Sequence, residues 1–322
     1  MNRARISLLC LGALLLIAAV AGVLLGTPVV APGDALAVLL GEQIPGISFI
    51  VMDSRLPTVA VAILAGISFG LSGTVFQTLL RNPLASPDVI GVTLGASAGA
   101  VIAIAVLRAS GATVFWCALG GGLLAAAVTL AVAGAGRRGT GSAVDHRFVL
   151  VGIAVGAALS ALISYLMTRI DTRTAGDVMH WMIGSLSAAT WQRALVLALA
   201  LAVLIPLLAV LVARLRVLQL GDDTATSLGL AVPRTRIALI LVGVMLSALT
   251  VAVTGPLARM LVGRPHFPTA AMIGAVIVLV AEFLGQNAFG RVEMPAGVIT
   301  GALGAPFLLW FLTRTPTSQN GR

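Results

Sequence analysis

Charged residues are scarce in this sequence. They make up 10% of the 322 residues, whereas 59% are hydrophobic, and the mean hydropathy is +1.09. A soluble domain carries about 25% charged residues, and here there are too few polar side chains to cover a water-facing body of this size. The composition therefore excludes an ordinary globular protein and a disordered one.

Lysine is absent, and acidic, cysteine and histidine residues are few. All 20 basic residues are arginines, against 11 acidic residues, 2 cysteines and 3 histidines. The arginines stand singly or in pairs between apolar runs, which is the pattern of a multispan membrane protein and not of a nucleic-acid-binding surface. Cys10 and Cys117 are isolated, and the histidines lie far apart. We expect a lipid bilayer around the chain, no nucleic-acid partner and no metal site.

Nine apolar runs are long enough to cross a bilayer, which takes about 20 residues. They lie near 6–26, 57–80, 89–107, 113–136, 148–168, 193–213, 234–254, 269–287 and 294–312. The runs do not alternate as barrel strands would, so helices are the expected spanning element. The first run is longer than the core of a signal peptide, the competing interpretation, and no clean cleavage site follows it. We predict a span with a cytoplasmic N-terminus.

Arginines are unequally divided between the two sides. With the N-terminus inside, the cytoplasmic loops 81–88, 137–147 and 214–233 and the helix start after them carry Arg81, Arg137, Arg138, Arg147, Arg214, Arg216, Arg234 and Arg236. The opposite side receives Arg55, Arg108, Arg169, Arg173 and Arg193. This excess supports the orientation.

Enzyme motifs are missing. The sequence contains no HExxH, no GxSxG and no Walker-type phosphate loop. A carrier driven by an ion gradient normally places ionisable groups at mid-membrane, and Glu282, toward one end of its run, is the fair candidate. We expect a chain that supplies a path and takes its energy from elsewhere; an ion-coupled secondary transporter remains the alternative of a different class.

Three segments have specialised sequences. Residues 81–100 begin with Arg-Asn-Pro, form a proline-bracketed turn and continue into a run rich in small residues. Residues 217–232 contain Gly221-Asp-Asp, which places negative charge at the positive end of a short helix; this segment is either a solvated loop or a helix that docks on a soluble partner. Residues 293–307 carry Pro295 at a helix start and Gly301, Gly304 and Pro306 inside a span, which predicts a bent, closely packed helix.

Together these strings resemble the FecCD family, the membrane permeases of bacterial ABC importers for iron–siderophores, haem and vitamin B12. The matching strings, in order, are Arg55-Leu-Pro57, Arg81-Asn-Pro-Leu-Ala with Gly91 to Gly99, Trp181-Met-Ile-Gly-Ser-Leu186, Gly221 to Gly229, and Glu293-Met-Pro with Gly304-Ala-Pro-Phe307. The resemblance covers nearly the whole chain, and it implies one all-α polytopic permease domain over 1–322, with a polar tail at 313–322.

The resemblance also implies partners. Family members have about ten helices, and two permeases, identical or not, form the pathway. Two cytoplasmic ATP-binding subunits bind below, and a substrate-binding protein docks above. On this basis ATP and Mg²⁺ belong to the partner ATPase, and the chain itself is expected to bind no cofactor and no metal.

The resemblance assigns roles to individual residues. The ATPase-coupling segment 217–232 contributes Gly221, Asp222, Asp223, Thr226, Leu228 and Gly229, with Ala225, Leu228 and Leu230 as its expected apolar side. A short gating helix after the fifth span contributes Trp181, Gly184 and Ser185, and the spans around 57–80 and 148–168 would line the route. Family motif positions without an assigned contact are Arg81, Asn82, Pro83, Gly91, Gly95, Pro295, Gly304 and Pro306.

Arg55 matches a position that meets acidic residues of the binding protein in the family. The alternative is an interfacial arginine that anchors a helix end. Thr58 and Gln286 stand where related permeases often carry arginine, so the set of docking charges departs from the family pattern, and Arg291 or a non-identical partner permease would have to supply the missing contacts.

A larger departure lies at 255–268. Family members follow Gly255-Pro256 with an apolar string ending in Pro-His, but here the chain passes directly to Leu257-Ala-Arg-Met-Leu-Val-Gly263. One span is therefore shortened or missing. A shortened or re-entrant passage, an inverted C-terminal part and an impaired protein are the alternatives; we favour a shortened passage with the C-terminus inside, because nine full crossings would violate the positive-inside rule.

The function predicted from the sequence is an inner-membrane permease subunit of an ATP-driven importer for a ferric siderophore. A haem or vitamin B12 permease of the same family is the nearest alternative.

Overall fold

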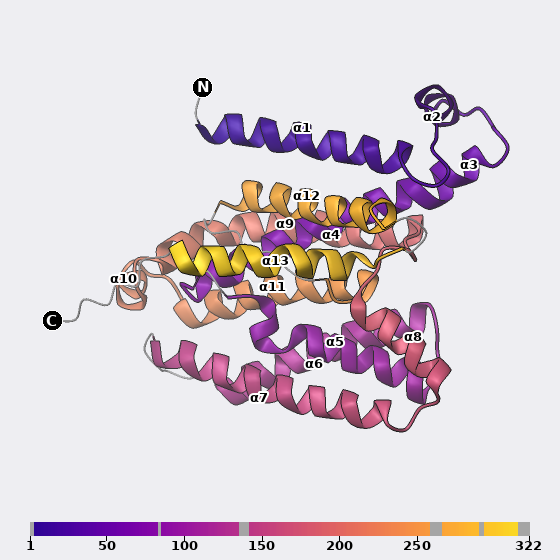
Figure 1. Ribbon diagram of the computed structural model, residues 1–322. Coiled ribbons are helices and arrows are strands. Elements are labelled where there is room, and N and C mark those ends of the chain that lie inside the picture. Colours follow the sequence, from indigo (N-terminus) through magenta and orange to yellow (C-terminus); the bar gives the residue numbers. More distant parts are fainter. Residues whose placement is uncertain (1–2, 83–84, 135–141, 258–265, 290–292, 315–322) are drawn as a thin grey trace.

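The computed structural model describes residues 3–82, 85–134, 142–257, 266–289 and 293–314. In these residues the chain is a bundle of helices, and every apolar run predicted from the sequence lies on one (Figure 1). The helices that carry these runs are α1 (Arg3–Leu24), α4 (Leu56–Leu79), α5 (Val92–Val101) extended by η3 (Ile102–Val106), α6 (Ala112–Ala133), α7 (Ser142–Met167), α9 (Trp191–Leu218), α11 (Val232–Thr254), α12 (Phe267–Asn287) and α13 (Ala296–Arg314).

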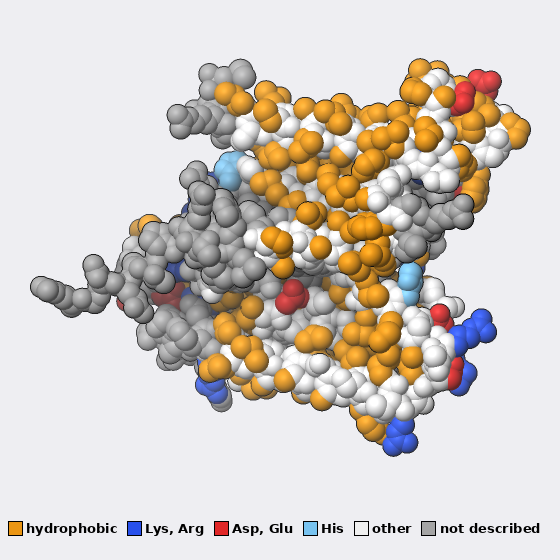
Figure 2. Space-filling model, in the orientation of Figure 1, with side chains coloured by type: hydrophobic (Ala, Val, Ile, Leu, Met, Phe, Trp, Pro, Cys, Tyr) orange, Lys and Arg blue, Asp and Glu red, His pale blue; other side chains and the backbone are white. Residues whose placement is uncertain are grey.

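Seven of the described helices are long and apolar enough to cross a bilayer, and Val92–Val106 and Ala296–Pro306 are shorter apolar helices. Short elements connect them: α2 (Pro32–Leu39), α3 (Ile47–Phe49), η1 (Ile50–Arg55), η2 (Pro87–Ile90), α8 (Thr172–Ile183) and α10 (Asp222–Ser227). We call the end of the bundle that carries α10 the inner end and the end that carries α8 the outer end. Hydrophobic side chains cover much of the visible face between them (Figure 2).

Helix α4 is the centre of the bundle, in contact with α1, α9, α11 and α12. Small residues allow the backbone of α4 to approach its neighbours closely. A Cβ added at Gly66 would lie 2.3 Å from the carbonyl oxygen of Gly274, and one at Gly70 would lie 2.2 Å from that of Ala270. The backbones of α4 and α12 therefore touch, as expected where helices associate in lipid by close packing of small residues.

Hydroxyl groups join α4 to α11. Ser68 donates to the carbonyl oxygen of Leu246 at 2.9 Å, and Ser72 donates to that of Gly243 at 2.6 Å. Both serines are buried, so the bonds satisfy polar groups that water cannot reach. Helix α4 is enclosed on most sides by its own neighbours, and the role of 57–80 in lining the route stays a prediction.

Helices α5, α6 and α7 form a second layer beside α11 (Figure 1). Glycines of the 81–100 segment and of α7 allow these helices to pack closely. A Cβ at Gly95 would lie 2.5 Å from the carbonyl oxygen of Gly121 on α6, and Gly91 precedes α5 with a φ of +79°. A Cβ at Gly152 of α7 would clash with the carbonyl oxygen of Val89 in η2. Gly91 and Gly95 thus have packing and backbone roles.

The order of contacts fixes the direction of the later helices. Residues 66 and 70 of α4 meet 274 and 270 of α12, and residues 68 and 72 meet 246 and 243 of α11. Helices α11 and α12 are therefore both antiparallel to α4 and parallel to each other. Consequently Thr254 lies at the outer end and Phe267 at the inner end, and only the twelve residues 255–266 join them.

This arrangement bears on the shortened span predicted at 255–268. The connection 255–266 is shorter than the about 20 residues of a helical crossing, and the shortened span stays a prediction. Residues 258–265 of it lie outside the described part of the chain. Helix α13 then runs back, so its end at Arg314 lies at the inner end with the start of α1 (Figure 1). The inverted C-terminal arrangement is not what the structure shows.

In the part of α13 whose side chains are described, 296–306, the helix packs closely at its start. Gly297 lies against the carbonyl oxygen of Ile183, and Ala296 and Thr300 are fully buried. Pro295 immediately precedes the helix, and Pro306 lies inside it. Gly304 is half-buried and Pro306 exposed. Beyond the first turns, no described part of this chain covers α13 as far as Pro306, and close packing there stays a prediction.

The crossing of α4 and α12 predicts a position-specific effect of one methyl group. Gly66→Ala should destabilise the protein by about 1–3 kcal/mol, because the new Cβ meets backbone that cannot move aside. Gly73→Ala is the matched control, since a Cβ there meets nothing within 4 Å. Thermal unfolding in detergent, followed by size-exclusion chromatography, measures both variants. Equal midpoints would show that the two backbones are not in contact.

Candidate functional sites at the two ends of the bundle

At the inner end, α10 forms an elbow between α9 and α11. Two glycines in the left-handed region bracket the helix, Gly221 with a φ of +108° and Gly229 with a φ of +81°. Asp222 pairs with Arg236 of α11 at 3.2 Å, and the Thr226 hydroxyl donates to the carbonyl oxygen of Asp222 at 2.7 Å. The predicted short helix opened by Gly221, Asp222 and Asp223 is thus present, and an ion pair holds it to the bundle.

The apolar side chains of the elbow differ from expectation. Ala225 is fully buried, but Leu228 is 64% exposed, and Leu220, just before the elbow, is 62% exposed. Ala225 and Leu228 do not share a buried side because α10 ends at Ser227. Leu220 and Leu228 are therefore exposed at the inner end, without cover from the described chain.

The Arg-Asn-Pro motif connects the elbow to the central helix. The Arg81 Nη2 donates to the carbonyl oxygen of Leu218, the last residue of α9, at 2.8 Å. Arg81 has a φ of +49° and follows the end of α4. The backbone N–H of Asn82 donates to the carbonyl oxygen of Gln77 at 3.1 Å. Pro83 lies outside the described residues. The sequence predicted the motif but not this contact between α4 and α9.

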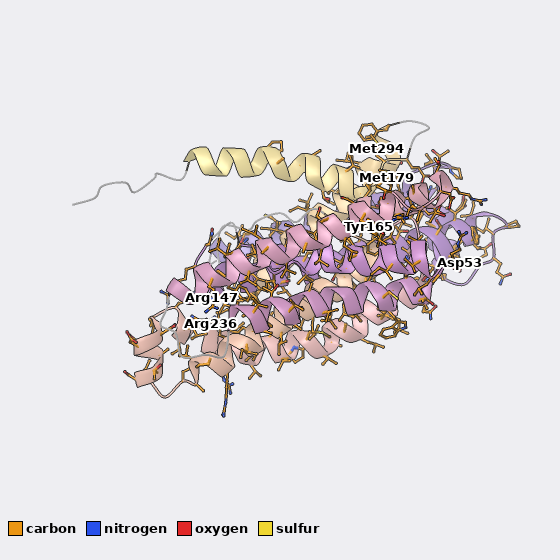
Figure 3. The ribbon with its side chains drawn as sticks, turned by 90° about the horizontal axis from the view of Figure 1, so that it is seen from below. Asp53, Arg147, Tyr165, Met179, Arg236 and Met294 are labelled. Atoms are coloured by element: carbon orange, nitrogen blue, oxygen red, sulfur yellow. The ribbon has the colours of Figure 1, made fainter. Side chains whose placement is uncertain are left out.

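Basic residues mark the inner end. Figure 3 shows Arg147 and Arg236 at one end of the bundle and Asp53 at the opposite end. Arg81, Arg214 and Arg216 also lie near the inner ends of their helices. The arginine excess on the α10 side agrees with the cytoplasmic location of that side predicted from the sequence.

At the outer end, Arg55 is buried, with only 8% of its surface exposed. Its guanidinium donates to the carbonyl oxygens of Val23 at 2.8 Å, Leu24 at 3.2 Å and Pro28 at 2.6 Å. Val23 and Leu24 end α1, so Arg55 caps that helix and fixes the chain that leaves it. This geometry favours the anchoring alternative, while the docking role stays a prediction.

Arg55 also borders a polar cavity of about 440 Å³ at the outer end. Its lining includes Thr58, Glu282, Gln286 and Glu293. Glu282 is 6% exposed and accepts a hydrogen bond from the Gln286 Nε2 at 2.7 Å. It lies five residues before the end of α12. The carboxylate that an ion-coupled carrier would need at mid-membrane is thus near the outer end. Arg291 lies outside the described residues.

The predicted gating residues lie at the end of α8, which follows α7. Asp171 begins this helix by accepting bonds from the hydroxyl and the amide of Thr174, at 2.8 and 3.1 Å, and these bonds lower the pKa of Asp171. Helix α8 is amphipathic and is not one of the helices long enough to cross a bilayer.

The C-terminal end of α8 is held between α11 and α13. The Ser185 amide donates to the Thr254 carbonyl oxygen at 3.0 Å, and Gly184 accepts from the Gly297 amide at 3.1 Å. Gly255 lies against the carbonyl oxygen of Trp181, and Gly184 against that of Pro256. Three elements thus converge on Gly184, which has a φ of +79° and no space for a side chain.

Comparison with known proteins gives one family. A model described as the FecCD transport family matches residues 14–314. The ferric enterobactin transport system permease protein of Escherichia coli is 32% identical over 97% of this chain and 96% of its own length. The Fe(3+)-citrate import system permease protein of Bacillus subtilis is 33% identical over 97% of this chain and 96% of its own length.

A solved structure has the same fold. It is described as an inward-facing conformation of a metal-chelate type ABC transporter, and it superposes with a TM-score of 0.82 at 26% identity, over 95% of this chain and 98% of the other. The likeness covers nearly the whole chain, so the helical bundle as a whole is a shared fold.

The Arg55 contacts lead to a stability prediction. Arg55→Gln should destabilise the protein by about 2–3 kcal/mol, because buried carbonyl oxygens lose a charged donor. Arg173→Gln, at an exposed arginine of the same outer end, is the control and should leave the thermal midpoint unchanged. A variant that is as stable as the parent but loses a salt-dependent association with the binding protein would instead assign Arg55 to docking.

Proposed function

The chain belongs to the FecCD transport family, and from this premise we propose that it carries a ferric siderophore, delivered by a binding protein, across the bacterial membrane. It is a multi-pass membrane permease of an ABC importer for an iron–siderophore, ferric citrate or haem, and it is a transport subunit without a catalytic role. The observation that carries the proposal is the match with the ferric enterobactin permease over 97% of the chain.

Haem is the second candidate. The relatives also include a hemin transport system permease of Yersinia pestis, and nothing that lines the described cavities distinguishes a planar cofactor from an iron chelate. A ferric siderophore is preferred because the ferric enterobactin permease matches 97% of this chain, whereas the hemin permease matches 84%.

The energy source is proposed to be a partner ATPase on the inner side, which would bind ATP and Mg²⁺. The elbow 217–232 supports this proposal. The elbow is short, and Asp222 pairs it with Arg236 of α11. Arg81 donates to the carbonyl oxygen of its residue Leu218, and its side chains Leu220 and Leu228 are exposed. An apolar projection of this kind fits a groove on a soluble subunit. The outer position of Glu282 speaks against the ion-coupled alternative.

A second permease would cover the exposed face of α7. Leu150 and Ile153 are 67% and 60% exposed, and Ala157 and Ala158 on the same helix are exposed too. Small residues allow close approach of another helix. We propose that two copies, or this chain and a related permease, meet here with the exposed part of α13 and enclose the pathway. The binding protein would then dock at the outer end.

The gate is proposed at the end of α8. Trp181, Gly184 and Ser185 lie where α8, α11 and α13 converge, so a displacement of α11 or α13 would be transmitted directly to α8. This proposal rests on backbone contacts, since Gly184 has no side chain to act with.

Uptake into proteoliposomes tests the function. The chain, reconstituted with its ATPase, binding protein and second permease, should take up iron-labelled ferric enterobactin only while ATP is hydrolysed. Ferric citrate and haem, offered in parallel, separate the candidate substrates. Uptake that survives an inactive ATPase but stops when the proton gradient collapses would contradict the proposal, and ATP-driven uptake of haem alone would select the second candidate.

Substitutions at the elbow test the coupling role. Leu228→Ser should weaken association with the ATPase about tenfold, since burial of a leucine contributes about 1.5–3 kcal/mol. Leu40→Ser is the matched control, because Leu40 is 80% exposed but lies at the outer end. A pull-down of the ATPase with each full-length variant measures association, and equal recovery would remove the elbow from the ATPase contact.

Two further variants address transmission. Gly229→Val should uncouple hydrolysis from uptake while membrane insertion persists, because a branched side chain is strained at a φ of +81°. Replacing Asp222 and Asp223 by Asn should have the same effect, partly through loss of the pair with Arg236. Unchanged uptake and ATPase stimulation would reject transmission through this segment.

A further inference from the structure

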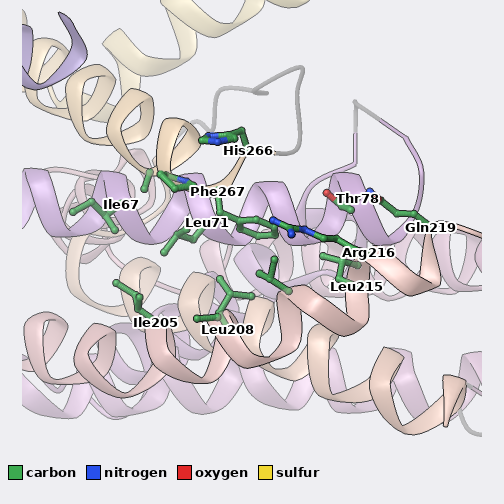
Figure 4. Close-up of a pocket in the computed structure, with 14 residues that line it drawn as sticks. Ile67, Leu71, Thr78, Ile205, Leu208, Leu215, Arg216, Gln219, His266 and Phe267 are labelled. Atoms are coloured by element: carbon green, nitrogen blue, oxygen red, sulfur yellow. The ribbon is translucent and has the colours of Figure 1, made fainter. Parts of the chain in front are cut away.

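A groove between α4, α9 and the start of α12 adjoins the elbow at Gln219 (Figure 4). Its volume is about 670 Å³, within the range of about 300–1,000 Å³ that small-molecule sites occupy. Most of its wall is apolar and comes from Ile67 and Leu71 of α4 and from Ile205, Leu208 and Val212 of α9.

One end of the groove is polar. Thr78, Arg216 and Gln219 lie together there, whereas Ile67 and Ile205 lie at the other end (Figure 4). Thr78 is only 8% exposed, and its hydroxyl has no hydrogen-bond partner among the described residues. Buried hydroxyl groups are normally paired, so this one indicates a ligand atom. Arg216 has no ion-pair partner in the described part of the chain.

The length of the groove corresponds to one leaflet. Eleven residues separate Ile67 from Thr78, and eleven separate Ile205 from Arg216, which is a rise of about 16 Å along each helix. Half of a hydrocarbon core of about 30 Å is about 15 Å. The polar end is the inner end, where Arg81 contacts Leu218. The groove therefore extends from the inner surface of the membrane to about its midplane.

We propose that this groove binds one anionic phospholipid of the inner leaflet. An acyl chain lies along Ile67, Leu71 and Leu208, and the phosphate accepts hydrogen bonds from Arg216, the Gln219 amide and the Thr78 hydroxyl. Ile205 and Ala209 are exposed, so the chain enters sideways from the bilayer. Basic pockets between helices on the cytoplasmic side are typical sites for anionic headgroups.

Charge complementarity selects a lipid as the occupant. An anionic phosphate would meet Arg216 at the inner surface of the membrane, while an acyl chain would meet the apolar wall of the groove.

Native mass spectrometry of the full-length permease tests the headgroup site. The protein is delipidated and reloaded with phosphatidylglycerol or phosphatidylcholine of identical acyl chains. We expect preferential retention of phosphatidylglycerol, and an about fivefold loss of that retention in Arg216→Gln, the change that corresponds to about 1 kcal/mol per basic residue at a lipid surface. Arg214→Gln, an exposed arginine two residues away that does not line the groove, should retain the lipid as the parent does.

A second pair of variants tests the acyl-chain site. Ala209→Phe fills the groove and should reduce retention of both lipids, whereas Val210→Phe, at an exposed neighbour outside the groove, should not. A monodisperse size-exclusion peak confirms that each variant folds. Equal retention of both lipids, equal effects of the two arginine variants, competition by inorganic phosphate, or a second protein copy bound in place of lipid would each overturn the proposal.

Discussion

The backbone contact between α4 and α12 is the constraint on which the rest of the bundle depends. Lipid chains are as apolar as leucine, so no hydrophobic force drives helices together within a bilayer. Association must come from close packing, and Gly66 and Gly70 allow it because their hydrogens leave room for the carbonyl oxygens of Gly274 and Ala270. With α12 on one side and the serine hydrogen bonds to α11 on another, α4 becomes a fixed axis around which the other spans are arranged.

Besides marking the inner side, arginines in this structure cap the ends of helices, which the composition alone does not reveal. Arg55 donates to the last carbonyl oxygens of α1, Arg81 to that of Leu218 at the end of α9, and Arg193 to that of Val253 near the end of α11, at 3.4 Å. The carbonyl groups in the last turn of a helix have no partner within it, and they are costly to leave unpaired near hydrocarbon. A guanidinium supplies several donors from one planar group and complements the negative end of the helix. Arg55 at the end of η1, Arg81 in the turn after α4 and Arg193 in the first turn of α9 each cap the end of another helix.

The spans and the elbow could be predicted from the sequence because each has a local signature. Each of the nine long apolar runs lies on a helix in the described part of the chain, and Gly221-Asp-Asp predicted α10. The buried state of Arg55 could not be predicted, since its partners are backbone carbonyl oxygens 27 to 32 residues earlier. The exposure of Leu228 depends on where a six-residue helix ends, which sequence patterns locate only to within a residue or two. The groove between α4 and α9 depends on packing between distant segments, so no local pattern predicts it.

These contacts form a continuous physical connection between the two ends of the molecule. A force on α10 reaches α11 through the pair of Asp222 and Arg236, and it reaches α4 through Leu218 and Arg81. At the outer end α11 finishes at Thr254, whose carbonyl oxygen holds the amide of Ser185 after α8. Because packed helices are stiff and their interfaces repack in discrete steps, a shift of α11 at the elbow must appear at Gly184 as well. Helix α11 alone therefore connects the elbow, which is proposed to contact the ATPase, with the end of α8, which is proposed to gate the pathway.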